Sequence, residues 1–174
     1  METDKKVNFQ LVPVFGLNYR NKIGQERWKK LSKKIRSEAN YVCSYCGEQH
    51  PEHYGTAAHE EWEYDDKNYL IYLHDIKCVC TECHHMVHIG FTEKKLGENA
   101  FVDAMIRYIQ INYTKSNHKK VFEAAMKAAF EDLNYAKKKW MERSEHKWQL
   151  APQVEIFVKE KYGREFTNLD IIRF

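Results

Sequence analysis

Four cysteines of this chain are spaced as the ligands of one metal ion. Cys43 and Cys46 form a C-x2-C pair, and Cys80 and Cys83 form a second pair after 33 intervening residues. Two such pairs, each turning two thiolates toward one point, are typical of a zinc site. Because four thiolates fill the tetrahedral shell of zinc, we expect a structural Zn²⁺ without an open position. The fifth cysteine, Cys78, is expected to be a small buried side chain.

Histidines near the second cysteine pair are candidate ligands for another ion. His84 directly follows Cys83, and His88 comes four residues later, so both side chains project from one face of the helix expected here. His59 lies on a predicted strand and is expected to face them. Three imidazoles suit a divalent transition metal. We therefore expect His59, His84 and His88 to bind a second, catalytic ion such as Mg²⁺, Mn²⁺, Ni²⁺ or Zn²⁺.

Each assignment has a plainer alternative. His84 can instead cap the helix or orient a zinc thiolate through a hydrogen bond, and His88 can serve only in packing. His50 and His53 offer a rival zinc ligand set with the first cysteine pair, which would leave Cys80 and Cys83 without an ion.

The elements that position these residues follow from local patterns. Residues 1–20 are expected to form an extended arm and residues 24–40 a basic amphipathic helix. Strands are predicted at 56–64 and 69–73, joined by a polar turn at 65–68 into a hairpin. A short helix should begin at the second cysteine pair and end at Gly90, and everything beyond it reads as helical. Helices are predicted around 101–109 and 121–140, Pro152 should mark a break, and the type of the amphipathic element at 154–162 is left open.

The expected fold class is therefore α+β. An N-terminal arm and basic helix (1–40) precede a zinc-clamped core (41–95), and a mainly α-helical region (96–174) packs on that core. The composition allows such a core, because 43% of the 174 residues are hydrophobic and 14% are aromatic.

Charge is distributed unevenly along the chain. The formal net charge is only +3, yet residues 43–100 carry eleven acidic and four basic side chains between two basic flanks. An acidic centre between basic flanks suits a divalent-metal site beside phosphate-binding surfaces, although solvated helix faces give the same pattern. No apolar run approaches the length of a membrane span, and residues 1–6 lack the apolar stretch of a signal peptide. We expect a cytoplasmic protein without a membrane partner.

The arrangement of these motifs resembles the HNH, or ββα-metal, endonucleases. The family combines a C-x2-C pair, a strand with a paired metal and base motif, and a second C-x2-C pair followed by histidine. A bacterial or phage origin is expected, since a bacterial subgroup with a His-Glu-x-x-Trp-x-Tyr strand and a Cys-His-x-x-x-His helix is similar to residues 59–64 and 83–88 here. The resemblance covers roughly residues 11–150 and implies a ββα-metal core.

The resemblance also assigns roles. It implies that His59 and His84 bind the catalytic metal together with His88, and that Glu60 stands where the family has a histidine general base. A register shifted by one residue would instead make His59 the base and place Ala58 at a ligand position. In either register one usual group of the paired motif is missing.

Two function classes follow. The first is a metal-dependent endonuclease that hydrolyses DNA phosphodiester bonds, with His59, Glu60 and His84 as catalytic residues. The alternative is a catalytically weak or inactive HNH-like zinc module that binds nucleic acid or a protein partner. The sequence leaves the oligomeric state open.

Overall fold

The computed structural model describes residues 7–11, 17–52 and 54–168 of the chain. Within these residues the chain forms seven α-helices, one short 3-10 helix and one three-stranded sheet. The expected α+β class is confirmed. The described helices include none long and apolar enough to cross a membrane.

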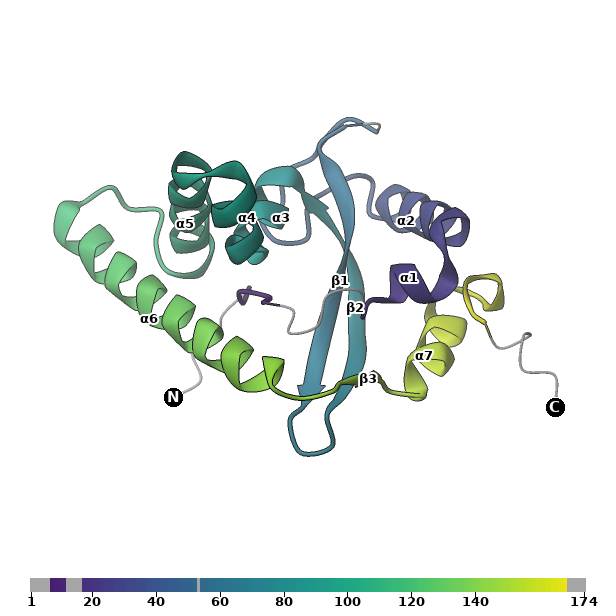
Figure 1. The fold of residues 1–174 in the computed structure, drawn as a ribbon. Coiled ribbons are helices and arrows are strands. Elements are labelled where there is room, and N and C mark those ends of the chain that lie inside the picture. Colours follow the sequence, from purple (N-terminus) through teal and green to yellow (C-terminus); the bar gives the residue numbers. More distant parts are fainter. Residues whose placement is uncertain (1–6, 12–16, 53, 169–174) are drawn as a thin grey trace.

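A long antiparallel hairpin occupies the centre of the molecule (Figure 1). It consists of β1 (Thr56–Asp65) and β2 (Leu70–Cys80). At the turn, Asp65 Oδ1 accepts hydrogen bonds from the backbone N–H groups of Lys67 and Asn68, both at 3.0 Å. The predicted hairpin is confirmed, but β2 continues past the expected end at Leu73 to Cys80, because its second half pairs with the first half of β1.

Helices cover both sides of this hairpin (Figure 1). One side holds α1 (Tyr19–Ile23), α2 (Gln25–Glu38), α7 (Gln153–Tyr162) and the 3-10 helix Arg164–Phe166. The other side holds α3 (Thr81–Val87), α4 (Ile89–Leu96), α5 (Glu98–Asn112) and α6 (Lys119–Ser144). The predicted helices at 24–40, 101–109 and 121–140 are thus confirmed as α2, α5 and α6.

Two hydrophobic cores lie on the opposite faces of the hairpin. Ala58 and Leu73 belong to the core with α1, α2 and α7, whereas Val79 belongs to the core with α3, α5 and α6. The separation follows from strand geometry, since successive side chains point to opposite faces. Each core combines residues from all three expected segments, 1–40, 41–95 and 96–174.

Gly90 does not end the helix after the second cysteine pair, contrary to the prediction. The break falls at His88, between α3 and α4, and Gly90 lies inside α4. A Cβ atom built on Gly90 would lie 3.2 Å from Cδ2 of Leu11. The glycine therefore permits a close approach of the N-terminal segment, and its role is not that of a terminator.

Two other predictions need correction. The expected arm does not extend to residue 20, because Asn18 accepts the N–H of Asn21 at 2.8 Å and starts α1 at Tyr19. The region after Gly90 is not entirely helical, since β3 (Gln149–Leu150) pairs in parallel with the start of β2. Pro152 does mark a break, and the element that follows it is α7.

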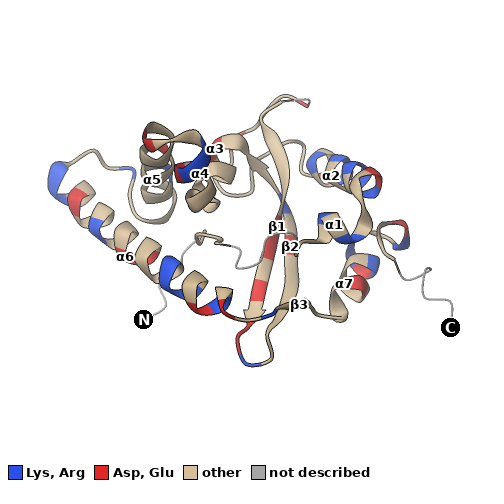
Figure 2. Cartoon of the chain, in the orientation of Figure 1, with Lys and Arg blue, Asp and Glu red and all other residues tan. Residues whose placement is uncertain are grey.

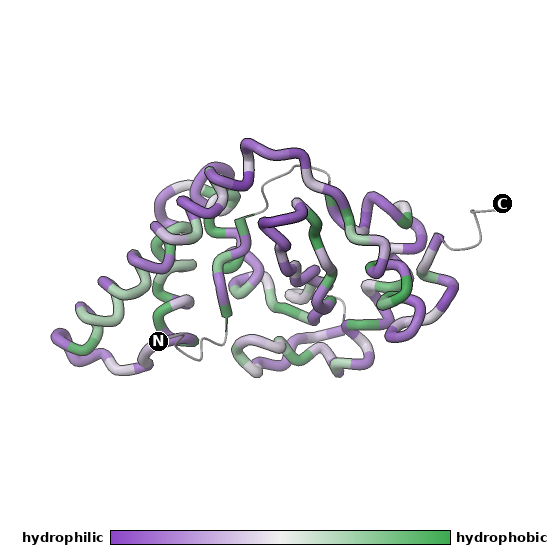
Figure 3. The backbone as a smooth tube through the Cα atoms, turned by 90° about the horizontal axis from the view of Figure 1, so that it is seen from below, coloured by the Kyte–Doolittle hydropathy of each residue, from purple (hydrophilic) through white to green (hydrophobic). Residues whose placement is uncertain are grey.

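The longest helix, α6, runs along one edge of the molecule, with hydrophobic and hydrophilic residues recurring along it (Figure 3). Ala125, Ala129 and Leu133 are buried against the core. Other apolar side chains of α6 stay exposed, including Phe130 at 42% and Trp140 at 42%. Helix α6 therefore buries one narrow row of side chains in the core and leaves other apolar side chains exposed to solvent.

Leu31 and Leu96 form a matched pair for testing the core on the α2 side. Leu31 is fully buried, whereas Leu96 is 47% exposed. We expect Leu31→Ala to lower the free energy of unfolding by about 2–5 kcal/mol, because it leaves a cavity. Leu96→Ala should change it by less than about 0.5 kcal/mol. Denaturant unfolding measures both, and equal losses would contradict the assigned packing.

Candidate functional site

The four cysteines of the two C-x2-C pairs come together in the structure. Their Sγ atoms all lie within 4.8 Å of one another, and Cys46 Sγ is 3.9 Å from Cys80 Sγ. Zinc with four Zn–S bonds of about 2.3 Å requires sulfur separations of about 3.8 Å. The cluster therefore fits a tetrahedral Zn²⁺ ion.

This cluster joins three parts of the fold. Cys43 and Cys46 lie in the loop between α2 and β1, Cys80 ends β2, and Cys83 lies in the first turn of α3. Cys80 Sγ also accepts the backbone N–H of Cys83 at 3.4 Å and so caps the helix. A bound ion would hold the loop, the strand and the helix in one geometry. Cys78 is buried at 1% exposure, as expected, and stands outside the cluster.

The thiols of the cluster have pKa values shifted in opposite directions, lowered for Cys43 and raised for Cys80 and Cys83. The pKa of Cys43 lies far below its ordinary value because the side chains of Cys80 and Cys83 hydrogen-bond to its sulfur. The pKa of Cys83 is raised, chiefly by the same hydrogen bond to Cys43. The Cys43 thiolate thus accepts hydrogen bonds from the thiols of Cys80 and Cys83. A bound Zn²⁺ would replace the protons of those thiols.

Arg107 on α5 supplies a positive charge beside the cysteines. Its Nη2 atom donates to Glu48 Oε2 at 2.7 Å, and its pKa is raised by Glu48 and then by Cys83. Its buried Nε atom has no hydrogen-bond partner. Four thiolates around Zn²⁺ carry a net charge of about −2, which this guanidinium would partly offset. No spacing pattern in the sequence points to Arg107.

His59, His84 and His88 form a second cluster. One ring nitrogen of each lies within 4.8 Å of the others, and the ring centroids are 4.8 to 5.3 Å apart. His59 comes from β1, His84 from α3, and His88 from the residue that ends α3. The three residues expected to share an ion are therefore brought together, and the arrangement could hold a metal.

Burial sets the protonation of these imidazoles. His59 is only 3% exposed, and its pKa lies well below the ordinary value because of burial and then repulsion from His88 and His84. Burial lowers the pKa of His84 to about 4 and also lowers that of His88. At neutral pH the rings are uncharged and keep the lone pair that a metal ligand needs.

Glu60 lies outside the histidine cluster. Alternation along β1 turns it to the same face as Ala58, which is buried against α1 and α2. Its Oε1 accepts the backbone N–H of Arg20 at 2.9 Å, at the start of α1. Burial raises the pKa of Glu60 to about 7, and the Arg20 hydrogen bond opposes that shift. The shifted register would place Ala58 at a ligand position, yet alanine offers no ligand atom and its side chain is buried in that hydrophobic core.

A polar network that the sequence did not indicate surrounds His59. Lys77 is its cross-strand partner, and Lys77 Nζ lies 2.8 Å from Glu61 Oε2. The Tyr45 hydroxyl donates to Glu61 Oε1 at 2.6 Å, and its ring meets that of His59 edge-on at 6.2 Å. Glu61 therefore holds both a cation and a phenol beside the histidines.

The remaining predicted ligands are placed differently. His50 lies near Cys80 and Glu48, each offering a ligand atom within 4.8 Å of the others. His53, the other member of the rival zinc set, lies outside the described residues. His85 is half-buried and belongs to neither cluster.

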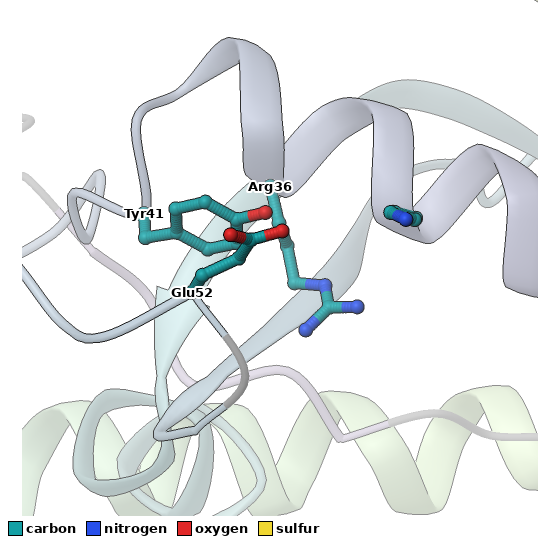
Figure 4. Close-up of a pocket in the computed structure, with 4 residues that line it drawn as sticks. Arg36, Tyr41 and Glu52 are labelled. Carbon is teal, nitrogen blue, oxygen red and sulfur yellow. The ribbon is translucent and has the colours of Figure 1, made fainter.

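A separate small cavity of about 180 Å³ lies at the end of α2. It is lined by Lys33, Arg36, Tyr41 and Glu52, and the Tyr41 ring and the Glu52 carboxylate lie close together in it (Figure 4). None of these residues belongs to the cysteine or histidine cluster. The cavity therefore adds no group to the candidate site.

Comparison with protein-family models, curated proteins and solved structures finds no match to this chain. The chemistry of the site is therefore argued from its own residues.

Substitutions of Cys83 and Cys78 distinguish the loss of a zinc ligand from the loss of a buried thiol. Purified protein should contain about one zinc per chain, held by the four-cysteine cluster. We expect Cys83→Ala to lose this zinc and to melt at a lower temperature, because metal binding is coupled to folding. Cys78→Ala should keep its zinc. Elemental analysis decides between them, and a zinc-replete Cys83→Ala variant would rule out the four-cysteine site.

Proposed function

We propose that this protein is a metal-dependent endonuclease of the HNH, or ββα-metal, type that hydrolyses DNA phosphodiester bonds. The observation that carries the proposal is the convergence of His59, His84 and His88 from a strand and the helix that follows it. Three neutral imidazoles leave part of a metal's coordination shell open to a substrate, unlike the four-cysteine cluster.

The cysteine cluster supports this role by fixing the distance between strand and helix. Thr56, at the start of β1, pairs with Cys80 at the end of β2, and His84 directly follows Cys83. Clamping Cys80 and Cys83 to the loop cysteines would therefore hold His84 opposite His59. Such rigidity matters because catalytic groups must keep a productive geometry to within a fraction of an ångström.

The residues around the histidines supply further parts of a hydrolytic site. A divalent cation held by the imidazoles would stabilise the charge that develops on the phosphate and on the leaving oxygen. Glu60 is next to His59 in the sequence but faces the other side of β1; as the general base it would turn to remove a proton from the attacking water. Lys77 lies across the strand pair from His59 and is suited to attract the phosphate.

One observation favours the second candidate function, a catalytically weak or inactive zinc module that binds nucleic acid or a protein partner. The Glu60 carboxylate is engaged by the N–H of Arg20 and faces the side of β1 opposite His59. A base in that position would have to turn toward the substrate. The inactive module predicts salt-sensitive DNA binding without nicking of plasmid DNA.

His84 and His85 test the histidine cluster on adjacent residues of one helix. With Mn²⁺ or Mg²⁺ added, we expect nicking of supercoiled plasmid by the unaltered protein. His84→Ala should reduce the rate by more than about 100-fold, because a metal ligand is lost. His85→Ala should nick at the unaltered rate, since His85 lies outside the cluster.

The endonuclease proposal fails if the zinc-replete protein, given each of these ions, cleaves neither DNA nor RNA. Equal loss of activity in the His84→Ala and His85→Ala variants would instead contradict the assignment of the metal ligands.

Glu60→Gln tests the base without removing the contact to α1. The glutamine carbonyl oxygen still accepts the Arg20 N–H, so the melting temperature should stay unchanged. If Glu60 is the base, the nicking rate should fall by about 10²–10⁴-fold. A full rate in the Glu60→Gln variant would show that Glu60 only anchors α1.

A further inference from the structure

A groove of about 860 Å³ lies beside the histidine cluster. Its walls come from the hairpin, from α6 and from the N-terminal segment Val7–Leu11, which in Figure 1 runs between α6 and β1. Hydrogen bonds and a ring stack hold this segment in place. Gln10 N–H donates to Val87 O at 2.8 Å, and the Phe9 ring stacks on that of Tyr108 at 3.9 Å.

The groove reaches residues that adjoin the histidine cluster. Glu61 and Glu63 line it, and alternation places both on the same face of β1 as His59. Lys77 and Tyr45 also line the groove, and both adjoin His59. A chain that reached the histidines along this face would pass through the groove toward the tip of the hairpin.

Aromatic side chains give the groove its binding character. Trp62, Tyr64, Tyr135 and Trp140 all line it. Tyr135 is 65% exposed and Trp140 is 42% exposed, so both rings are accessible to a ligand in the groove. Exposed rings in a groove are the platforms on which successive unpaired bases stack.

The cations that line the groove are Lys77, Lys139 and Arg143, and Figure 2 shows both basic and acidic residues along α6. Each of the three cations is ion-paired, with Glu61, Glu142 and Asp66 respectively, so a phosphate would compete with a carboxylate for it. The carboxylates that line the groove are already engaged: Glu61 with Lys77 and Tyr45, and Glu63 with His74 Nδ1 at 2.9 Å. Asp132 accepts hydrogen bonds from the hydroxyls of Tyr108 and Tyr113.

The volume limits what can enter. A space of this size accommodates a small ligand or a few nucleotides, whereas a duplex presents its bases only at groove edges and cannot stack them on protein rings. A single strand exposes both the bases and the backbone that the groove is equipped to contact.

We propose that this groove binds a single-stranded nucleic acid segment leading to the histidine cluster, so that the preferred substrate is single-stranded or locally unpaired. The substrate preference in this inference rests on the proposed endonuclease function, whereas binding of the strand does not. The groove itself is argued from its exposed rings, its cationic side chains and the contacts of Lys77 and Tyr45 with His59.

Binding is tested with the full-length, zinc-replete His84→Ala variant, which separates binding from cleavage. The probes are fluorescein-labelled oligothymidylate of about 12 nucleotides, an oligouridylate of equal length and a duplex of equal length. Fluorescence anisotropy should show the single strands binding at least about tenfold more tightly than the duplex. The two single strands distinguish a DNA segment from an RNA segment.

Trp140 and Met141 provide the matched comparison on α6. Trp140 lines the groove, whereas the adjacent Met141 is 62% exposed and does not. Trp140→Ala, added to the same background, should weaken oligothymidylate binding about tenfold. Met141→Ala should leave it unchanged.

The groove assignment is overturned if the duplex binds as tightly as the single strands, or if Trp140→Ala and Met141→Ala behave alike. The two proposals fail separately. Single-strand binding that depends on Trp140, without cleavage by the unaltered protein, would remove only the endonuclease function. Cleavage that depends on His84 but shows no preference for single strands would remove only the groove.

Discussion

The four cysteine thiols at the junction of the first loop, β2 and α3 are the constraint on which the rest of the site depends. Cys43 and Cys46 lie before the hairpin, and Cys80 and Cys83 lie after it. An ion bound by all four would close the chain around the whole hairpin, and closing a long loop removes much of the freedom of the unfolded chain. Arg107 reaches this point from α5, so the helical half is tied to the same junction.

The hairpin uses its two faces for different purposes. Along β1, Ala58 and Glu60 turn toward α1 and α2, while His59 and Glu61 turn toward α3 and the groove. A slip of one residue in the register would exchange these faces and break up the histidine cluster. A metal ion bound at Cys80 would oppose such a slip, since Cys80 pairs directly with Thr56. Metal binding by the cysteines would therefore help to fix the strand register.

Segments distant in the sequence complete the surroundings of the site. Residues 7–11 pass over Gly90 and contribute to the groove, and the Gln10 side chain donates to the carbonyl of Glu60 at 2.9 Å on the edge strand β1. On the other face, the Tyr19 hydroxyl donates to the buried carboxylate of Glu155 on α7 at 3.0 Å. Tyr19 directly precedes Arg20, whose backbone N–H donates to Glu60. The position of Glu60 thus depends on both ends of the chain.

The sequence by itself pointed to the cysteine and histidine clusters, the hairpin and the main helices. Cysteine and histidine spacings act within a knuckle or one helical turn, and hydrophobic periodicity reports each element locally. Only the tertiary structure decided that β2 extends to Cys80, that Gly90 lies under Leu11, and that Arg107 and Lys77 adjoin the two clusters. It also created the groove. These features depend on how whole elements pack, and packing is set by many side chains acting together, so no short stretch of sequence encodes it.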